Sequence, residues 1–263
     1  MSSPSKWDDL LPRIASGAAL AAIGLGCIWA GGFWFTTLAV VAAGVMAWEL
    51  ARIIVPEAGA DAYLLGLVAG LSVAAARLVP DLAVVPVLML PAVAWDLTLK
   101  RDFKTFGGVT LLIGLAAWGL AEFRMTYGMV WLFWLVGVVI ATDIAGYFVG
   151  KTLGGAKFWP AISPKKTWSG IIGGWVAAAL VGAVFLTFTD AGRDLIWISS
   201  VVAFVSQMGD IGESAVKRRY GVKDASNLIP GHGGLMDRFD ALLGASLAML
   251  VVALLVDVPE VRF

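Results

Sequence analysis

The chain is poor in the residues that build many soluble catalytic and metal sites. Its 263 residues include a single cysteine, Cys27, and a single histidine, His232. One cysteine excludes an internal disulfide and a cysteine metal cluster, and one histidine disfavours a zinc hydrolase. Charged residues make up only 14% of the chain and their formal charges sum to zero. This balance argues against a nucleic-acid partner, because such a partner requires a basic excess.

Apolar side chains, by contrast, are abundant. Hydrophobic residues form 60% of the sequence and the mean hydropathy is +0.87. Since a bilayer-spanning helix needs about 20 apolar residues, this composition predicts an all-α, polytopic integral membrane protein. The continuous runs lack the alternating pattern of a transmembrane β-barrel. Breaks at glycine, proline and charged residues predict nine spans, at 14–30, 33–54, 62–79, 82–99, 109–123, 129–149, 171–188, from 195 to at least 208, and 241–256.

Glycine and proline also predict the local form of two spans. Gly31 and Gly32 separate the first two spans and indicate a tight connection with almost no loop. Pro86 and Pro91 lie inside the fourth span, where we expect them to kink the helix. After the short polar start of the chain, a retained first helix is expected rather than a cleaved signal peptide.

The basic residues are distributed unevenly over the loops. Of nineteen Lys and Arg residues, fifteen fall in the N-terminal segment and in the loops that would share its side of the membrane. Because basic loops are retained in the cytoplasm, we expect a multi-pass protein of the cytoplasmic (inner) membrane with a cytoplasmic N-terminus and an active site that faces the cytoplasm. We expect one membrane domain, with a helical scaffold at 1–128 and a catalytic half at 129–263.

The densest polar stretch, residues 209–240, lies between two apolar runs. Charged groups beside hydrocarbon are costly, so they indicate a functional site. If the eighth helix continues past Met208, residues at i, i+3, i+4 and i+7 share one face. These residues are Asp210, Glu213, Ser214 and Lys217.

Flexible PGHGG backbone follows at 230–234, and Asp237 and Asp240 come next at the expected start of the ninth helix. There, exposed N–H groups and the helix dipole would also favour an anion. The carboxylates suggest Mg²⁺, which takes one or two carboxylates together with phosphate oxygens and water. The surrounding basic residues suggest phosphate. Together they predict phosphoryl or nucleotidyl transfer.

A second polar loop, at 150–170, is also suited to phosphate. Its hydroxyl and ammonium donors are Ser163, Lys165, Lys166, Thr167 and Ser169. Asp143, in the sixth span, is an intramembrane carboxylate and a further site candidate. Gly170 and Gly174 have the spacing of a close helix contact.

Simpler structural roles compete with several of these interpretations. Asp210 and Asp237 could form structural ion pairs with adjacent basic residues. His232 could equally be a satisfied turn residue. Glu49 and Asp96 lie near span ends, where we expect them at the membrane interface.

The second half of the chain resembles a known family. The pattern SxxKRxxxxKDxxxxxPxHGGxxDRxD, read from Ser214 to Asp240, resembles the signature of the phosphatidate cytidylyltransferases, also called CDP-diacylglycerol synthases. SPKKTWSG from Ser163 and DIAGYFVGKTLG from Asp143 resemble that family too, which commonly has Glu where this chain has Ser169. The resemblance covers about 143–240, and the first half is similar only as a set of apolar spans.

The resemblance implies transfer of a cytidylyl group from CTP to phosphatidic acid, giving CDP-diacylglycerol for phospholipid synthesis and releasing pyrophosphate. We interpret Asp210 and Asp237 as Mg²⁺ ligands and, with Lys217, as catalytic residues for in-line attack of the lipid phosphate on the α-phosphorus. Asp143 and Glu213 are supporting candidates, and a second cation or a homodimer is compatible with this interpretation. Substrate-binding roles are expected for Ser163, Lys165, Lys166, Thr167, Ser214, Arg218, Lys223, Asp224, His232, Arg238 and Asp240.

Two other functions fit part of the pattern. A transporter would use Asp143, Asp210 and Glu213 to carry protons or cations, but it leaves the PGHGG loop unexplained. A polyprenol or lipid kinase would use the same Mg²⁺ and lysines. It differs in transferring the γ-phosphate of its nucleotide rather than the cytidylyl group.

Overall fold

The computed structural model describes residues 10–259, which contain ten α-helices and one two-stranded sheet. The chain divides into two compact units, each described here by itself. Unit 1 comprises Met1–Trp118 and Tyr220–Phe239, and unit 2 comprises Gly119–Arg219 and Asp240–Phe263. Each unit therefore combines segments that are distant in the sequence. The expected division into a scaffold at 1–128 and a catalytic half at 129–263 concerns function and stays a prediction.

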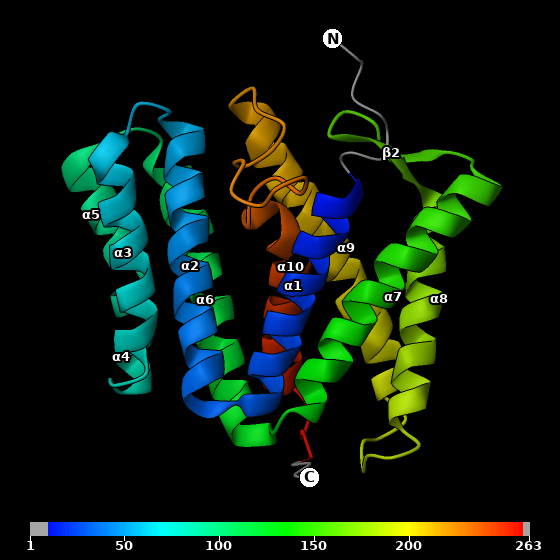
Figure 1. Cartoon of the computed structure of the whole chain (residues 1–263). Helices are drawn as coiled ribbons and strands as arrows, with labels where there is room; N and C mark the ends of the chain where they lie inside the picture. Colours follow the sequence, from blue (N-terminus) through cyan, green and yellow to red (C-terminus); the bar gives the residue numbers. More distant parts are fainter. Residues whose placement is uncertain (1–9, 260–263) are drawn as a thin grey trace. The chain divides into compact units, whose positions relative to one another are not determined.

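Unit 1 is built on a close pair of helices, α2 and α3, which lie side by side (Figure 1). A Cβ atom added at Gly66 would lie 2.7 Å from the carbonyl oxygen of Gly44, so only glycine permits this backbone approach. The other helices of the unit pack around this pair or extend from it. Its helices are α1 (Leu10–Ala30), α2 (Gly32–Ile54), α3 (Gly59–Ala76), α4 (Asp81–Leu88) and α5 (Leu90–Thr98), and α6 (Phe103–Tyr127) contributes to both units.

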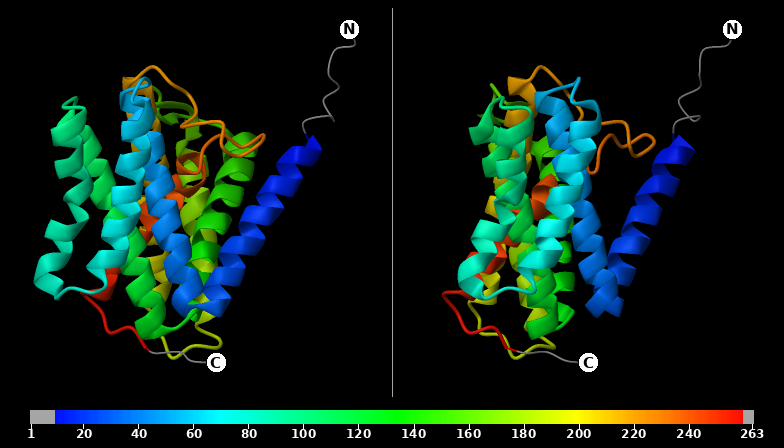
Figure 2. Two further views of the ribbon diagram at one scale, coloured as in Figure 1. Left: turned by 60° about the vertical axis from the view of Figure 1, so that its left-hand side comes forward. Right: turned by 90° about the vertical axis from the view of Figure 1, so that its left-hand side faces the viewer.

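The tight connection between the first two spans and the break at the prolines of the fourth span, both expected from the sequence, are confirmed. α1 ends at Ala30 and α2 begins at Gly32, with φ angles of 62° at Gly31 and 44° at Gly32 that a side chain would strain. Figure 2 shows this turn between the two helices. The fourth span is broken at Met89, between Pro86 inside α4 and Pro91 in the first turn of α5.

Unit 2 is built on α7 and α8, which lie side by side (Figures 1 and 2). A Cβ atom at Gly170 would lie 2.6 Å from the carbonyl oxygen of Gly146, and one at Gly174 would lie 3.2 Å from that of Thr142. The expected glycine-mediated helix contact is thereby confirmed. The elements are α7 (Val130–Leu153), β1 (Lys157–Trp159), β2 (Ser163–Thr167), α8 (Trp168–Phe185), α9 (Leu195–Arg219) and α10 (Met236–Ala253), whose residues up to Phe239 belong to unit 1.

The second polar loop differs from the sequence expectation, which placed no strand in it. β1 and β2 pair antiparallel, with Lys157 opposite Thr167 and Trp159 opposite Ser163. This hairpin lets the backbone groups of a short polar segment satisfy one another. It leads directly into α8, whose first turn is capped by Thr167.

In the part of the chain that the structure describes, seven helices are long and apolar enough to cross a membrane, so the chain is a polytopic membrane protein. They are α2, α3, the α4–α5 segment counted as one, α6, α7, α8 and α9. α6 extends well beyond the 109–123 block expected from the sequence. The apolar part of α1 is shorter, and the first turns of α10 carry three charged residues. Nine spans and a cytoplasmic N-terminus stay predictions.

Candidate active site

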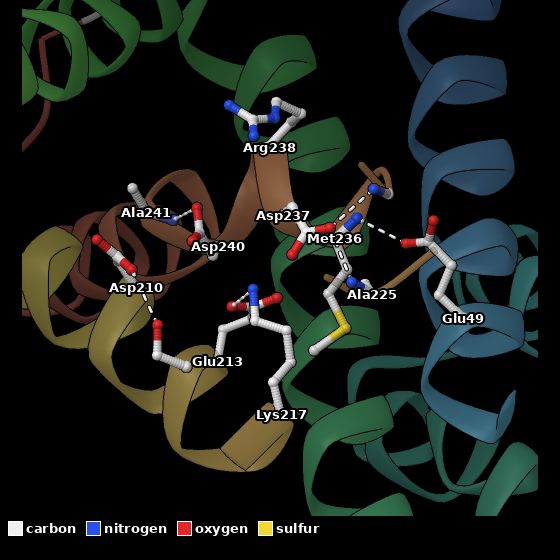
Figure 3. Close-up of polar contacts among 12 residues, drawn as sticks. Glu49, Asp210, Glu213, Lys217, Ala225, Met236, Asp237, Arg238, Asp240 and Ala241 are labelled. Carbon is white, nitrogen blue, oxygen red and sulfur yellow. Dashed lines mark hydrogen bonds and ion pairs between the residues drawn. The ribbon is translucent and has the colours of Figure 1, made fainter. Parts of the chain in front are cut away.

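One face of α9 carries the polar residues expected from the sequence. The helix continues to Arg219, so Asp210, Glu213, Ser214 and Lys217 share a stripe, as predicted. Ser214 Oγ donates to Asp210 Oδ1 at 3.4 Å, and Lys217 Nζ lies 2.6 Å from Glu213 Oε2 (Figure 3). One face of this helix therefore presents two carboxylates, a hydroxyl and an ammonium group.

Lys217 and Glu213 form a buried ion pair. Their side chains are 10% and 3% exposed, respectively. Removing one member of a buried pair leaves the other charge uncompensated, which is strongly destabilising. Glu213 thus holds the ammonium group of Lys217 in place within unit 2. This geometry places the Glu213 carboxylate directly beside the expected catalytic lysine.

The hairpin brings a second cation to the α9 stripe. Lys166 on β2 places its Nζ 2.5 Å from Asp210 Oδ2, and the two side chains are 24% and 34% exposed. Lys165, its neighbour on the strand, is exposed. The structure therefore joins one residue from each of the two polar loops that the sequence singled out.

Carboxylates gather around this ion pair. α9 crosses α10 at Gly209, where an added Cβ would clash with the carbonyl oxygen of Asp240 and lie 3.1 Å from the Cα of Gly244. Asp143, Asp210 and Asp240 lie near enough for their charges to repel one another. Asp240 precedes the expected ninth span, and its burial together with the Asp210 carboxylate raises its pKa to about 7. A cation in this region would relieve the repulsion.

The donor set suits a metal ion that the substrate helps to hold. Among the residues that the structure describes, no group of three or more His, Cys, Asp or Glu side chains could hold a metal ion. Mg²⁺ usually takes only one or two carboxylates and completes its shell with water and substrate phosphates. The carboxylates of this site therefore fit Mg²⁺ bound with a nucleotide better than a metal enclosed by protein alone.

In unit 1, Asp237 organises the loop that precedes α10. Its Oδ2 accepts hydrogen bonds from the backbone N–H of Ala225 at 2.8 Å and of Gly234 at 2.7 Å (Figure 3). The two donors lie nine residues apart in the chain, so this carboxylate links the two ends of the segment between Ala225 and Gly234. Asp237 belongs to unit 1 and Asp210 to unit 2, and each is held by contacts within its own unit.

Glu49, on α2, has contacts that the sequence interpretation did not predict. We expected it near a span end at the membrane interface, and the structure shows in addition that it is fully buried within the protein. Its carboxylate accepts hydrogen bonds from Ser226 Oγ at 2.6 Å and from the backbone N–H groups of Leu235 and Met236 at 2.8 and 2.7 Å. The signal that could have found it is the one used for Asp143: an acidic residue inside an apolar span.

These contacts also correct the expectation for the start of the ninth helix. Exposed N–H groups there were expected to favour an anion. Instead, the N–H of Gly234 donates to Asp237 and those of Leu235 and Met236 donate to Glu49. The protein's own carboxylates occupy these donors, so they are not available to a substrate phosphate.

His232 and Arg238 are tied into the same loop. Ser16 Oγ on α1 lies 2.7 Å from His232 Nδ1 and donates to the carbonyl oxygen of Pro230 at 3.0 Å. Arg238 donates from Nε and Nη2 to the carbonyl oxygen of His232, at 3.0 and 2.8 Å. The interpretation of His232 as a satisfied turn residue gains support from these bonds.

The remaining candidates differ in how they are held. Thr167 is buried and accepts a hydrogen bond from the N–H of Gly170 at 3.2 Å, so it caps α8. Ser163 is partly exposed at the start of β2. Arg218, Lys223 and Asp224 are exposed, where a soluble polyanion could reach them.

Known proteins resemble this chain over nearly its full length. Residues 11–256 match the model of the cytidylyltransferase family. The phosphatidate cytidylyltransferase of Brucella suis is 33% identical over 261 residues, which cover 96% of each chain. That of Bacillus subtilis is 39% identical over 174 residues, covering 62% of this chain and 64% of its own. That of Staphylococcus aureus strain COL is 38% identical over 152 residues, covering 55% of this chain and 58% of its own.

Proposed function

Because the chain belongs to the phosphatidate cytidylyltransferase family and transfers the cytidylyl group of CTP to phosphatidate, we propose that the two motif-bearing polar loops supply its catalytic groups. The product is CDP-diacylglycerol, an intermediate of phospholipid synthesis. The observation that carries the proposal is the ion pair between Lys166 and Asp210, which joins the SPKKTW segment to the polar stripe of α9. Acidic and basic groups at one place match a reaction between a triphosphate and a lipid phosphate.

The proposed chemistry assigns the carboxylates to Mg²⁺ and the ammonium groups to phosphate. Asp210 and Asp237 hold the ion, which when bound supplies Lewis-acid stabilisation of the phosphate oxygens of CTP. Lys166 and Lys217 offset the charge on the triphosphate, and Glu213 keeps Lys217 in place. An oxygen of phosphatidate attacks the α-phosphorus in line, a new P–O bond forms, and the bond to the β-phosphate breaks to release pyrophosphate.

The other site residues are proposed to bind substrate or to support those that do. Exposed Arg218 lies in the last turn of α9, and exposed Lys223 and Asp224 lie in the loop that follows. Asp143 and Asp240 would supply charge for a second cation. A homodimer also stays a prediction, which the mass of the protein in detergent micelles would test. The full set of proposed substrate-binding residues is Ser163, Lys165, Lys166, Thr167, Ser214, Arg218, Lys223, Asp224, His232, Arg238 and Asp240.

The active site is proposed to face the cytoplasm from the inner membrane. The excess of basic residues in the loops on the N-terminal side supports this orientation. CTP is a soluble polyanion and phosphatidate is a membrane lipid, so their reaction belongs at the interface between cytosol and bilayer.

Substitution of the two proposed metal ligands tests the assignment. We expect Asp210→Asn and Asp237→Asn each to lower the rate of transfer by about 100-fold or more, since each removes a charged group that stabilises the transition state. The assay follows label from the α-phosphate of CTP into lipid while Mg²⁺ is varied. A lipid kinase would transfer only the γ-phosphate and would leave the lipid unlabelled.

The exposed Asp81, at the start of α4, provides the control, because Asp81→Asn makes the same chemical change away from the loops. It should leave the rate unchanged. Near-normal rates in both the Asp210 and the Asp237 variants would remove the metal assignment.

A further inference from the structure

Glu49 is a fully buried carboxylate that lies outside the sequence motifs of the catalytic half. A buried charge is retained at a large cost unless hydrogen bonds compensate it. Within residues 10–259, three groups donate to Glu49, and all come from one segment, residues 226–236, which joins the polar loop to α10 (Figure 3 shows the bond to Met236). The fold therefore commits an acidic residue of α2 to holding this segment.

We propose that Glu49 is a positioning residue for the transfer reaction: it holds the 226–236 segment and the first turn of α10, and through them fixes the carboxylate of Asp237. The bonded N–H groups belong to Leu235 and Met236, the two residues that immediately precede Asp237. Their positions determine where the Cα of Asp237 lies and how its side chain leaves the helix.

The packing around Glu49 leaves little freedom to the loop. A Cβ atom added at Gly234 would lie 2.5 Å from Glu49 Oε1, so the backbone approaches the carboxylate as closely as glycine allows. Ser226 Oγ, which donates to the same oxygen, itself accepts from the N–H of Leu228 at 3.1 Å. The anchor thus reaches the two ends of the segment, at 226–228 and at 234–236.

Glu49 and Asp237 divide the donors at the start of α10 between them. Asp237 Oδ2 accepts from Gly234, whereas Glu49 accepts from Leu235 and Met236. If Glu49 could not accept, the nearby side chain of Asp237 would be drawn toward the vacant donors, since acidic groups are favoured at a helix N-terminus. Glu49 therefore keeps the N–H groups of Leu235 and Met236 from competing for the Asp237 carboxylate, whose Oδ2 already accepts from Ala225 and Gly234.

The substitution Glu49→Gln tests this role with little change in volume. The glutamine carbonyl can still accept from Ser226 and Leu235, but its NH₂ group would face the N–H of Met236, so one hydrogen bond becomes a contact between donors. We expect kcat/KM for CTP to fall about tenfold or more, as for loss of a hydrogen bond to a charged group. We also expect the Mg²⁺ concentration for half-maximal rate to rise, and amide hydrogen exchange at 234–236 to accelerate.

Two further variants complete the design. Ser226→Ala removes one donor and keeps the carboxylate. It should change kcat/KM for CTP, the Mg²⁺ requirement and amide exchange at 234–236 in the same direction by a smaller factor. Glu57→Gln is the matched control, because Glu57 is exposed in the turn just after α2. It should shift none of them.

The inference rests on the proposed role of Asp237, but the exchange measurement does not, so the two can fail separately. Fast exchange at 234–236 in Glu49→Gln, together with a normal rate in Asp237→Asn, would overturn the role of Asp237 while the anchor stands. Protected amides and an unchanged Mg²⁺ requirement in Glu49→Gln would overturn the anchor. So would a loss of activity that merely follows the loss of folded protein.

Discussion

Lys165 and Lys166 offer a matched pair of substitutions on one strand. Neighbouring side chains of a strand point to opposite faces, and only Lys166 reaches Asp210, with its Nζ 2.5 Å from Oδ2. In the part of the chain that the structure describes, Lys165 is exposed and has no ion pair. Lys166→Ala and Lys165→Ala therefore remove the same charge from two sides of one hairpin. We expect only the first to impair transfer strongly.

The expected loss of transfer rate in Lys166→Ala follows from the distance between the Lys166 and Asp210 charges and from their exposure to solvent. Two unit charges about 4 Å apart interact by about 1 kcal/mol in water and by about 4 kcal/mol at the effective dielectric near a protein surface. The Lys166 and Asp210 side chains are 24% and 34% exposed, so solvent screening keeps the value near the lower limit. A loss of about 1–2 kcal/mol corresponds to a factor of about 5–30. For Lys165→Ala, we expect a smaller loss that appears in KM for CTP, because the exposed charge of Lys165 is proposed to bind substrate but is screened by solvent.

The assay measures kcat and KM for CTP with purified protein and phosphatidate in mixed detergent micelles. Lys166→Arg retains the charge and should recover part of the rate lost in Lys166→Ala. Circular dichroism of each variant confirms that the helices are intact. Equal effects of the two alanine substitutions, or a normal rate in Lys166→Ala, would refute the assignment of Lys166 to the site.

Two further predictions concern stability and topology. Gly170→Ala places a Cβ 2.6 Å from the carbonyl oxygen of Gly146 and should cost about 1–3 kcal/mol, measured as a lower Tm in detergent. Gly108→Ala on α6, where an added Cβ meets nothing within 4 Å, should be neutral or stabilising, and equal Tm values for the two variants would contradict the helix contact. For topology, Cys27→Ser removes the only cysteine, and Lys157→Cys or Asp190→Cys then adds one at an exposed position, on β1 or in the loop after α8. A membrane-impermeant thiol reagent should label the cysteine at 157 in inside-out vesicles and the one at 190 in right-side-out vesicles; the reverse pattern would invert the proposed orientation.

Features that depend on local geometry were predictable from the sequence. The helical period placed Asp210, Glu213, Ser214 and Lys217 on one face of α9, and the helix does continue far enough to carry them. Proline breaks the fourth span because it removes a backbone donor and clashes with the preceding turn. These predictions succeeded because each involves residues within one or two turns of one another.

The contacts that shape the loop before α10 were not predictable in this way. Glu49 bonds to Ser226 across 177 residues, and Ser16 meets His232 across 216. No periodicity or spacing links such positions, because tertiary packing alone brings them together. The composition of the Glu49 span indicated only that an acidic group lay in an apolar helix.

The hairpin at 157–167 was missed for a different reason. Its strands are three and five residues long, and they contain lysines and a proline rather than alternating apolar residues. They have no strand-like hydrophobic pattern because much of the hairpin is exposed. The N–H groups at the start of α10 were also misjudged. The sequence alone suggests that such groups lack partners, whereas in the structure Glu49 of α2 accepts hydrogen bonds from two of them.

The dependence of Glu49 on a late segment has a consequence for biosynthesis. α2 leaves the ribosome and enters the bilayer long before Ser226, Leu235 and Met236 have been made. During that interval, the nascent helix carries an acidic group whose compensating donors do not yet exist. Synthesis of the 226–236 segment both offsets this cost and completes the loop, so residues up to Met236 must be made before any turnover. A chain that terminates before residue 226 would contain α2 without the donors for Glu49. We expect this buried carboxylate without hydrogen bonds to destabilise the truncated protein in the membrane.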